Sequence, residues 1–431
     1  MTPKGKGCEG CPLQSQGNWM VPDEVRRGQV YVLGQNPGEE EEAQGAPFVG
    51  KTGGYLERKL LPLAGLSRDQ VDLGNALRCR IRGSNKLPGL NTKEIREAIA
   101  HCQRAYYRPG PQTRIHVALG VYATYALTGE ARGEDVGDEE ERKPDPRGYL
   151  LHMLGQDRQG GPPSVFVSPH PARLFGKQPQ YEPVVRRDWR KVGRILAGTW
   201  PRQPPSFLYE PLQTWPGDFA LDTEFTPQGK LVRYSMTWGG RDGETAVVEA
   251  EAHLRPVWNG VPRITVQYAP ADVLHLQHLS GVEDPWRAFD LQDTVWLHAL
   301  LWPDLPHNLN FLGSLYGSIN RWKHLADVDP QLYAGCDSLV TWEVKEALEA
   351  ELGRDPQLAR VWEMDKQVLK HFVRGQQWGL AVDRGRAKEV QGELKERMEV
   401  ARRQMQAVVG WPINPGSGPQ VGKRLWEEER L

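Results

Sequence analysis

The spacing of hydrophobic residues divides the chain into two regions that contain strands and a last region that is helical. Short apolar runs at residues 30–33, 117–119 and 165–167 end at glycine or serine and predict buried strands. A helical pattern follows the third run and ends near Ala197. Strands alternating with helical segments predict an α/β domain built on a mainly parallel sheet.

A proline-rich connection comes next, with Trp-Pro pairs at Trp200 and Trp215, and it cannot continue a helix or a strand. Beyond it, residues 219–225 predict a strand, and residues 272–279 and 331–348 predict helices. We therefore expect a second α/β domain, with a mixed sheet.

From about Gln357 the pattern is helical. Seven apolar residues recur there at steps of three and four, which predicts one apolar stripe and a packed pair of helices. These residues are Ala387, Val390, Leu394, Met398, Ala401, Met405 and Val408.

Composition limits the function only loosely. A length of 431 residues favours two or three domains, and 39% hydrophobic residues are enough for ordinary cores. No apolar stretch approaches the roughly 18 residues of a membrane span, so no membrane partner is expected. The formal net charge of -1 does not indicate nucleic-acid binding, so contacts with DNA have to use local patches. Without a secretory leader, the protein is expected to be cytoplasmic and reduced, and to lack disulfides.

The segment from Gly34 to Gly54 has two interpretations. Residues 45–52 fit the phosphate-loop pattern G-x-x-x-x-G-K-[ST], which would make the chain a nucleotidase that uses Lys51. That loop requires a strand running directly into its first glycine, whereas the nearest apolar run ends before Gly34. Four consecutive glutamates, 39–42, would also repel a triphosphate, so the pattern favours the other interpretation.

The other interpretation rests on several motifs in a fixed order. They are Cys8-x-x-Cys11-Pro12-Leu13, G-Q-N-P-G at 34–38, G-A-P-F-V-G at 45–50, N-A-L-R-C-R at 75–80, Arg147-Gly148 and His170-Pro171-Ala172. In order and spacing, residues 8–196 resemble the iron-sulfur uracil-DNA glycosylases. The resemblance implies an α/β/α sandwich and an enzyme that cleaves uracil from the deoxyribose of DNA.

The resemblance also assigns roles in a site that receives a nucleotide swung out of the base stack. Phe48 is the expected platform under the base, and the Asn75 amide offers a donor and an acceptor to the uracil edge. His170 is the expected donor to the negative charge that collects on uracil as the bond breaks. Asn36 or Gln35 is expected to place the attacking water.

Gly34 and Pro37 of the G-Q-N-P-G motif are expected to contact the substrate, but the two residues between them depart from the family. Its members carry a glutamate in place of Gln35 and a small residue in place of Asn36. An amide orients a water but cannot act as a general base. We therefore expect a slow glycosylase, or a domain that holds uracil without removing it.

Four of the five cysteines lie in the first 102 residues and predict a metal site. Cys8 and Cys11 are close, whereas Cys79 and Cys102 are widely spaced, and the spacing alone leaves zinc and an iron-sulfur centre open. The resemblance implies a structural 4Fe-4S cluster held by all four. Cys336 is expected in a core. The cluster would tie the amino terminus to a basic loop that meets phosphates, with Arg78, Arg80, Arg82 and Lys86.

Acidic residues of the second domain predict a cation site. Asp222 and Glu224 are two apart on a predicted strand, so their carboxylates share one face, which a divalent cation between them would favour. Tyr333 and Asp337 are four apart on a predicted helix and share one side. Asp272 opens another predicted helix, so four carboxylates and a phenol are available.

This ordered set resembles the proofreading 3′-5′ exonucleases of polymerase I-like (family A) DNA polymerases from bacteria and phages, over residues 219–352. It implies a ribonuclease-H-like domain in which Tyr333 orients the attacking water. The family's His-Asn-x-x-Phe-Asp is replaced by Gln267-Tyr268-Ala269-Pro270-Ala271-Asp272, which predicts a reduced nuclease. Two Mg²⁺ or Mn²⁺ ions would be held by Asp222, Glu224, Asp272 and Asp337.

Residues 379–383 and 414–420 resemble the entrance to the thumb of the same polymerases. Because the chain ends at Leu431 without room for a palm, DNA synthesis is not expected. The expected organisation is a glycosylase-like domain (1–198), a linker (199–216), an exonuclease-like domain (217–355) and the helical start of a thumb (356–431).

Three functional hypotheses remain open. The first is a repair and replication enzyme that excises uracil from DNA and shortens single-stranded 3′ ends. The second is a non-catalytic module that anchors a separate polymerase domain at uracil. The third is the phosphate-loop nucleotidase.

Overall fold

The structure is a computed structural model, and it describes residues 2–15, 19–80, 92–130, 145–154, 164–176, 178–239, 243–253, 255–410 and 414–422. The chain divides into two compact units, Met1–Val373 and Arg374–Leu431. The first unit contains both five-stranded sheets.

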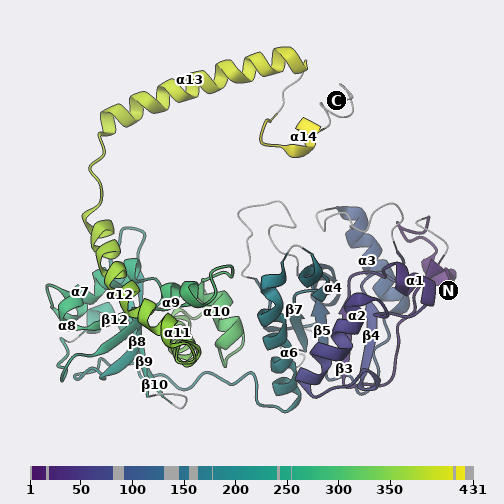
Figure 1. Cartoon of the computed structure of the whole chain (residues 1–431), viewed down its shortest axis with the longest axis horizontal. Helices are drawn as coiled ribbons and strands as arrows, with labels where there is room; N and C mark the ends of the chain where they lie inside the picture. Colours follow the sequence, from purple (N-terminus) through teal and green to yellow (C-terminus); the bar gives the residue numbers. More distant parts are fainter. Residues whose placement is uncertain are drawn as a thin grey trace. The chain divides into compact units, whose positions relative to one another are not determined.

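The first sheet has the strand order β4-β3-β5-β7-β6, and only β6 runs antiparallel to its neighbour (Figure 1). Every residue of these strands is buried, as is typical of a parallel sheet covered on both faces. The three predicted apolar runs are confirmed as strands. The strands are β3 Val30–Gly34, β4 Val71–Asn75, β5 Ile115–Leu119, β6 Leu150–Leu151 and β7 Val165–Ser168.

Helical segments cover both faces of this sheet. Alternate residues of β3 point to opposite sides: Val30 packs in the cluster that contains Trp189, and Tyr31 packs in the cluster that contains Leu127. The α/β/α sandwich is therefore confirmed. The α-helices are α1 Glu39–Gln44, α2 Lys51–Tyr55, α3 Lys93–Tyr106, α4 Val121–Thr128 and α6 Glu182–Leu196, with η2 Leu56–Leu60 and η3 Leu61–Ala64 following α2.

The second sheet is mixed, as expected, with the order β10-β9-β8-β11-β12 (Figure 1). The first three strands are antiparallel to one another, and β11 is parallel to β8 and β12. The strands are β8 Asp218–Phe225, β9 Leu231–Trp238, β10 Glu244–Glu249, β11 Arg263–Val266 and β12 Asp290–Asp293.

The longest helix of the second domain lies against this sheet, because Ser235 of β9 donates to the Ala334 carbonyl at 2.6 Å. Asp272 does not open its helix, which begins three residues earlier. The helices are α7 Ala269–Ser280, α8 Pro285–Ala288, α9 Thr294–Leu301, α10 Leu309–Tyr316, η10 Lys323–Leu325 and α11 Pro330–Leu352.

The proline-rich connection is packed, since Trp200 is 2% exposed and donates from Nε1 to the Gly317 carbonyl at 3.2 Å. Helices α6 and α10 also contact each other, and Lys191 donates to the Ser314 carbonyl at 2.7 Å. The two sheet domains thus share one compact unit. The limits 1–198, 199–216, 217–355 and 356–431 stay a prediction.

Three helices end the chain: α12 Pro356–Trp378, α13 Arg384–Val409 and α14 Gly418–Gly422. Leu369 and Val373 of α12 are buried in the core of the second sheet. In contrast, α13 buries none of its residues, and the packed pair of helices stays a prediction. No described helix is both long and apolar enough to cross a membrane.

Candidate functional site

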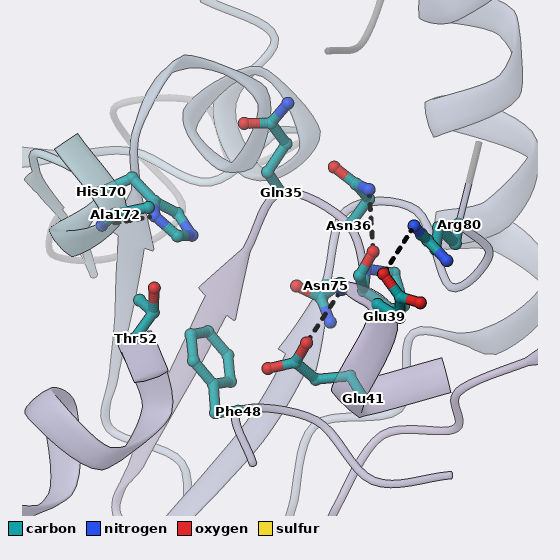
Figure 2. A pocket seen from close by; sticks show the side chains of 12 residues that line it. Gln35, Asn36, Glu39, Glu41, Phe48, Thr52, Asn75, Arg80, His170 and Ala172 are labelled. Carbon is teal, nitrogen blue, oxygen red and sulfur yellow. Dashed lines mark hydrogen bonds and ion pairs between the residues drawn. The ribbon is translucent and has the colours of Figure 1, made fainter. Parts of the chain in front are cut away.

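A cavity of about 290 Å³ opens where β3, β4 and β7 end (Figure 2). Three segments far apart in the sequence meet there, because the carboxyl ends of parallel strands lie at one edge of the sheet. Phe48, Asn75 and His170 all line it, as the sequence predicted. The remaining lining residues are Gln35, Asn36, Pro37, Gly38, Glu39, Glu41, Thr52, Arg80 and Ala172.

Gly34 does not line the cavity but lies behind two residues that do. A Cβ at this position would lie 2.5 Å from Asn75 Oδ1 and 2.8 Å from Phe48 Cζ. Phe48 itself has φ 55, a left-handed conformation that is strained for an aromatic residue. Its carbonyl accepts from Arg68 Nη1 at 2.9 Å, which helps to hold it there. Phe48, the predicted base platform, is therefore held in one backbone conformation.

His170 is prepared to donate from one particular nitrogen. The Ala172 backbone N–H donates to His170 Nδ1 at 3.2 Å, so the neutral ring carries its proton on Nε2. Burial lowers the pKa of His170 to about 4, which keeps the ring neutral at pH 7. A neutral N–H donor at the cavity is the group that the predicted role requires.

The two amides of the G-Q-N-P-G motif lie differently. Figure 2 shows the Gln35 side chain directed away from Phe48 and Asn75. Asn36 donates from Nδ2 to the Pro37 carbonyl at 3.0 Å, which leaves its Oδ1 as the atom that can accept a hydrogen bond from water.

Glu41 is a functional residue that the sequence analysis missed. Its two carboxylate oxygens accept from the Gly38 and Gly50 backbone N–H groups at 2.9 and 3.0 Å. These contacts join the segment that carries Asn36 to the segment that carries Phe48. The available signal was the run of four glutamates in the first turn of a helix, a favourable position for negative charge.

The phosphate-loop hypothesis lacks the geometry that it requires. Helix α1 lies between the end of β3 and Gly45, so no strand runs into the loop. Lys51 Nζ lies 4.4 Å from the centre of the Phe175 ring instead of facing a cradle of backbone N–H groups.

The four predicted cluster ligands meet at one small cavity of about 20 Å³, lined by Cys8, Cys11, Cys79 and Cys102. Burial raises the pKa of the Cys79 thiol to about 11, and it also raises the pKa of Cys11 and Cys102. Without a cation these groups stay thiols.

The sulfur atoms are spaced more widely than the ligands of one zinc ion. Tetrahedral zinc, with Zn–S bonds of about 2.3 Å, would bring its sulfur ligands within about 3.8 Å of one another. All four cysteines belong to the described residues, and no three of their sulfur atoms lie within 4.8 Å of one another.

The predicted basic loop is wrong for one member. Arg78 is 1% exposed and pairs with Asp23 at 2.6 Å, while its Nη1 also lies 3.8 Å from Cys102 Sγ. It therefore supports the cysteine cluster and does not face DNA phosphates. Arg80 lines the cavity and contacts Glu39 at 3.3 Å, whereas Arg82 and Lys86 lie outside the described residues. Cys336 is buried, as predicted.

A second site lies between β8 and α11. Carboxylate oxygens of Asp222, Glu224 and Asp337 lie within 4.8 Å of one another. Burial raises the pKa of Asp222 and Glu224, and the Asp337 charge raises both further. Asp222 Oδ2 is buried and has no hydrogen-bond partner among the described residues. An orphaned carboxylate oxygen in a group of like charges fits a divalent cation.

The fourth predicted ligand, Asp272, contacts Thr223 through one of its two oxygens. Asp272 Oδ1 accepts from the backbone N–H and the hydroxyl of Thr223, at 3.1 and 2.6 Å. Asp272 is not part of the group of three carboxylates and instead fixes the residue between Asp222 and Glu224. Burial raises the pKa of Asp272 to about 8.

Tyr333 lies beside this group, and its partner was missed by the sequence analysis. Lys323 Nζ donates to the Tyr333 hydroxyl at 3.0 Å and to both oxygens of Asp337. Burial raises the pKa of Tyr333 to about 12, so its hydroxyl stays protonated. No local pattern marks Lys323, because it precedes the helix that carries the other two residues.

The first domain is similar to a known family of proteins. Residues 22–191 match the model of the uracil DNA glycosylase superfamily, and the domain has a uracil-DNA glycosylase-like fold. The chain is 28% identical to the type-4 uracil-DNA glycosylase of Saccharolobus solfataricus over 207 residues. The matched region covers 47% of this chain and 87% of that protein. The type-4 uracil-DNA glycosylase of Pyrobaculum aerophilum is 29% identical over 192 residues, which cover 43% and 86% of the two chains.

Among solved structures, the chain is similar to Brucella melitensis NrnC with bound Mg²⁺. The TM-score is 0.32 and the sequence identity 16%, over 39% of this chain and 92% of that chain.

Proposed function

We propose that the first domain removes uracil from DNA. The observation that carries the proposal is that Phe48, Asn75 and His170, from three separate segments, line one cavity. The similarity to two type-4 uracil-DNA glycosylases supports the same function, because it extends over most of the length of each of those proteins.

The geometry suits a base swung out of the stack. Phe48 offers its ring to the base, and the Asn75 amide offers a donor and an acceptor to the uracil edge. Cytosine presents the opposite pattern and would leave both amide atoms unpaired. His170 Nε2–H then stabilises the negative charge that develops on uracil, and Asn36 Oδ1 orients the attacking water.

The test is release of uracil from labelled single- and double-stranded oligonucleotides by the full chain. We expect slow release that falls about 10-fold or more in Asn36→Ala. Gln35→Glu is the matched variant, because it restores a carboxylate on a side chain directed away from Phe48. We expect it to leave the rate unchanged. Equal rates for wild type and Asn36→Ala would remove Asn36 from the mechanism.

A second candidate is binding of uracil without excision, since neither Gln35 nor Asn36 is a general base. Retention of uracil oligonucleotides in a gel-shift assay, with no free uracil after long incubation, would favour it. In that case the anchoring of a separate polymerase domain becomes the function to test.

We further propose that Cys8, Cys11, Cys79 and Cys102 hold a structural 4Fe-4S cluster. A bound cluster would supply the positive charge that four thiolates need, two of which are buried, and the Arg78 guanidinium beside Cys102 adds to it. The test is the colour of the purified protein and its content of iron and zinc; brown, iron-containing protein is expected. Colourless, zinc-loaded protein would contradict it.

For the second domain we propose a metal-dependent 3′-5′ exonuclease of reduced activity. Asp222 and Glu224 would hold the cation beside Asp337, Tyr333 would orient the water, and Asp272 would fix the strand through Thr223. A bound divalent cation lowers the pKa of water and neutralises charge on the leaving oxygen. The test is shortening of a labelled single-stranded primer with Mg²⁺ or Mn²⁺, with Asp222→Ala as control. No metal-dependent shortening would reject the activity.

A further inference from the structure

One lysine side chain enters the carboxylate group of the second domain. Lys323, in η10 ahead of α11, donates from Nζ to Asp337 Oδ1 and Oδ2 at 2.8 and 2.7 Å. The same nitrogen donates to the Tyr333 hydroxyl at 3.0 Å. The Lys323 side chain is 19% exposed and that of Asp337 4%, so water competes little for this pair.

These contacts use much of the capacity of Asp337. Its Oδ1 also accepts from Trp322 Nε1, so this oxygen has two donors and Oδ2 has one. A carboxylate offers about four lone-pair positions in all. Asp222 differs, because its Oδ2 is buried and has no hydrogen-bond partner in the described part of the chain. The coordination left for a cation is therefore concentrated at Asp222 and Glu224.

The lysine also changes the charge of the group. Three carboxylates lie within 4.8 Å of one another, and one ammonium already lies against them. The Lys323 ammonium pairs with Asp337 Oδ2 at 2.7 Å and so brings one positive charge to this place.

We propose that the Lys323 ammonium replaces one of the two divalent cations, so that the site binds a single cation through Asp222 and Glu224. In this arrangement Lys323 acts as a positioning residue, which orients Asp337 and Tyr333 as a second cation would otherwise do. The inference rests on the proposed nuclease function of the second domain. The number of divalent cations bound at this site can be measured whether or not the domain is a nuclease.

The experiment counts Mn²⁺ ions bound to the full chain, by calorimetry and by the electron paramagnetic resonance signal of free Mn²⁺. Only ions lost in Asp222→Ala count as bound at this site. We expect one such ion in wild type. We expect two in Lys323→Met and in Lys323→Gln, which keeps hydrogen bonds to Asp337 and Tyr333 but removes the charge.

Lys366→Met is the matched control, since Lys366 pairs with Glu363 at 3.0 Å away from the carboxylate group. It should bind one ion. Two Asp222-dependent ions in wild type would overturn the inference, and so would none. A folded Lys323→Gln variant that binds only one such ion would also overturn it. Primer shortening is assayed separately. If one ion binds to wild type and two to the Lys323 variants while no primer is shortened, the nuclease function fails and the role of Lys323 stands.

Discussion

The packing of Gly34 behind two residues that line the cavity makes one substitution decisive for the proposed function. In Gly34→Ala the new methyl group would lie 2.5 Å from Asn75 Oδ1 and 2.8 Å from Phe48 Cζ. Carbon contacts are comfortable at about 3.5 Å, so each group has to move by about 0.7–1 Å. Asn75 and Phe48 are only 5% and 6% exposed, which leaves them little room to withdraw.

We expect two measurable effects of Gly34→Ala. Overpacking should lower the free energy of unfolding by about 1–3 kcal/mol. Displacement of the base platform and the reading amide by about 1 Å should lower the uracil excision rate about 100-fold. Single-turnover excision from a labelled oligonucleotide, with urea unfolding of the same preparation, measures both.

Gly5→Ala is the control, because nothing lies within 4 Å of its added methyl group. It should match wild type in both measurements. Wild-type excision by Gly34→Ala would refute the placement of Phe48 and Asn75 around the base. A loss of stability without a loss of rate would refute the link between this packing and catalysis.

Three further predictions follow from burial and charge. Cys79→Ser should lose iron and visible absorbance, whereas Cys336→Ser, in another core, should keep both; an unchanged iron content in Cys79→Ser would exclude Cys79 as a ligand. As pH falls from about 6.5 to 4, wild type should lose stability, because the pKa of His170 is lowered in the folded state and the unfolded chain takes up the proton first. His170→Gln should lose less over that interval in urea unfolding, and an equal loss would contradict the neutral ring. Trp189→Ala should lower the free energy of unfolding by about 3–5 kcal/mol, measured by urea, since the side chain is 0% exposed; a change below 1 kcal/mol would contradict its place in the core.

Local patterns predicted the elements well. The apolar runs became β3, β5 and β7, because a short run that is hydrophobic on both sides is stable only inside a covered sheet. The period of two in β8 also placed Asp222 and Glu224 on one face, and both belong to the carboxylate group.

Local patterns failed where a residue's surroundings come from elsewhere in the chain. Arg78 reads as part of a basic loop, yet Asp23 pairs with it in the interior. Periodicity reports which residues share a side of a helix, and it does not report what lies opposite.

The sequence by itself determined the chemical inventory: the amides, the histidine, the thiols and the carboxylates, together with the strands that carry most of them. Only the tertiary structure decided which of them meet. Parallel strands bring their carboxyl ends to one edge, so Phe48, Asn75 and His170 gather around one cavity although up to 122 positions separate them (170 minus 48). Tertiary packing also places Lys323 against Asp337 and Asp272 against Thr223. Such contacts depend on how segments cross in space, so no periodic pattern along the chain predicts them.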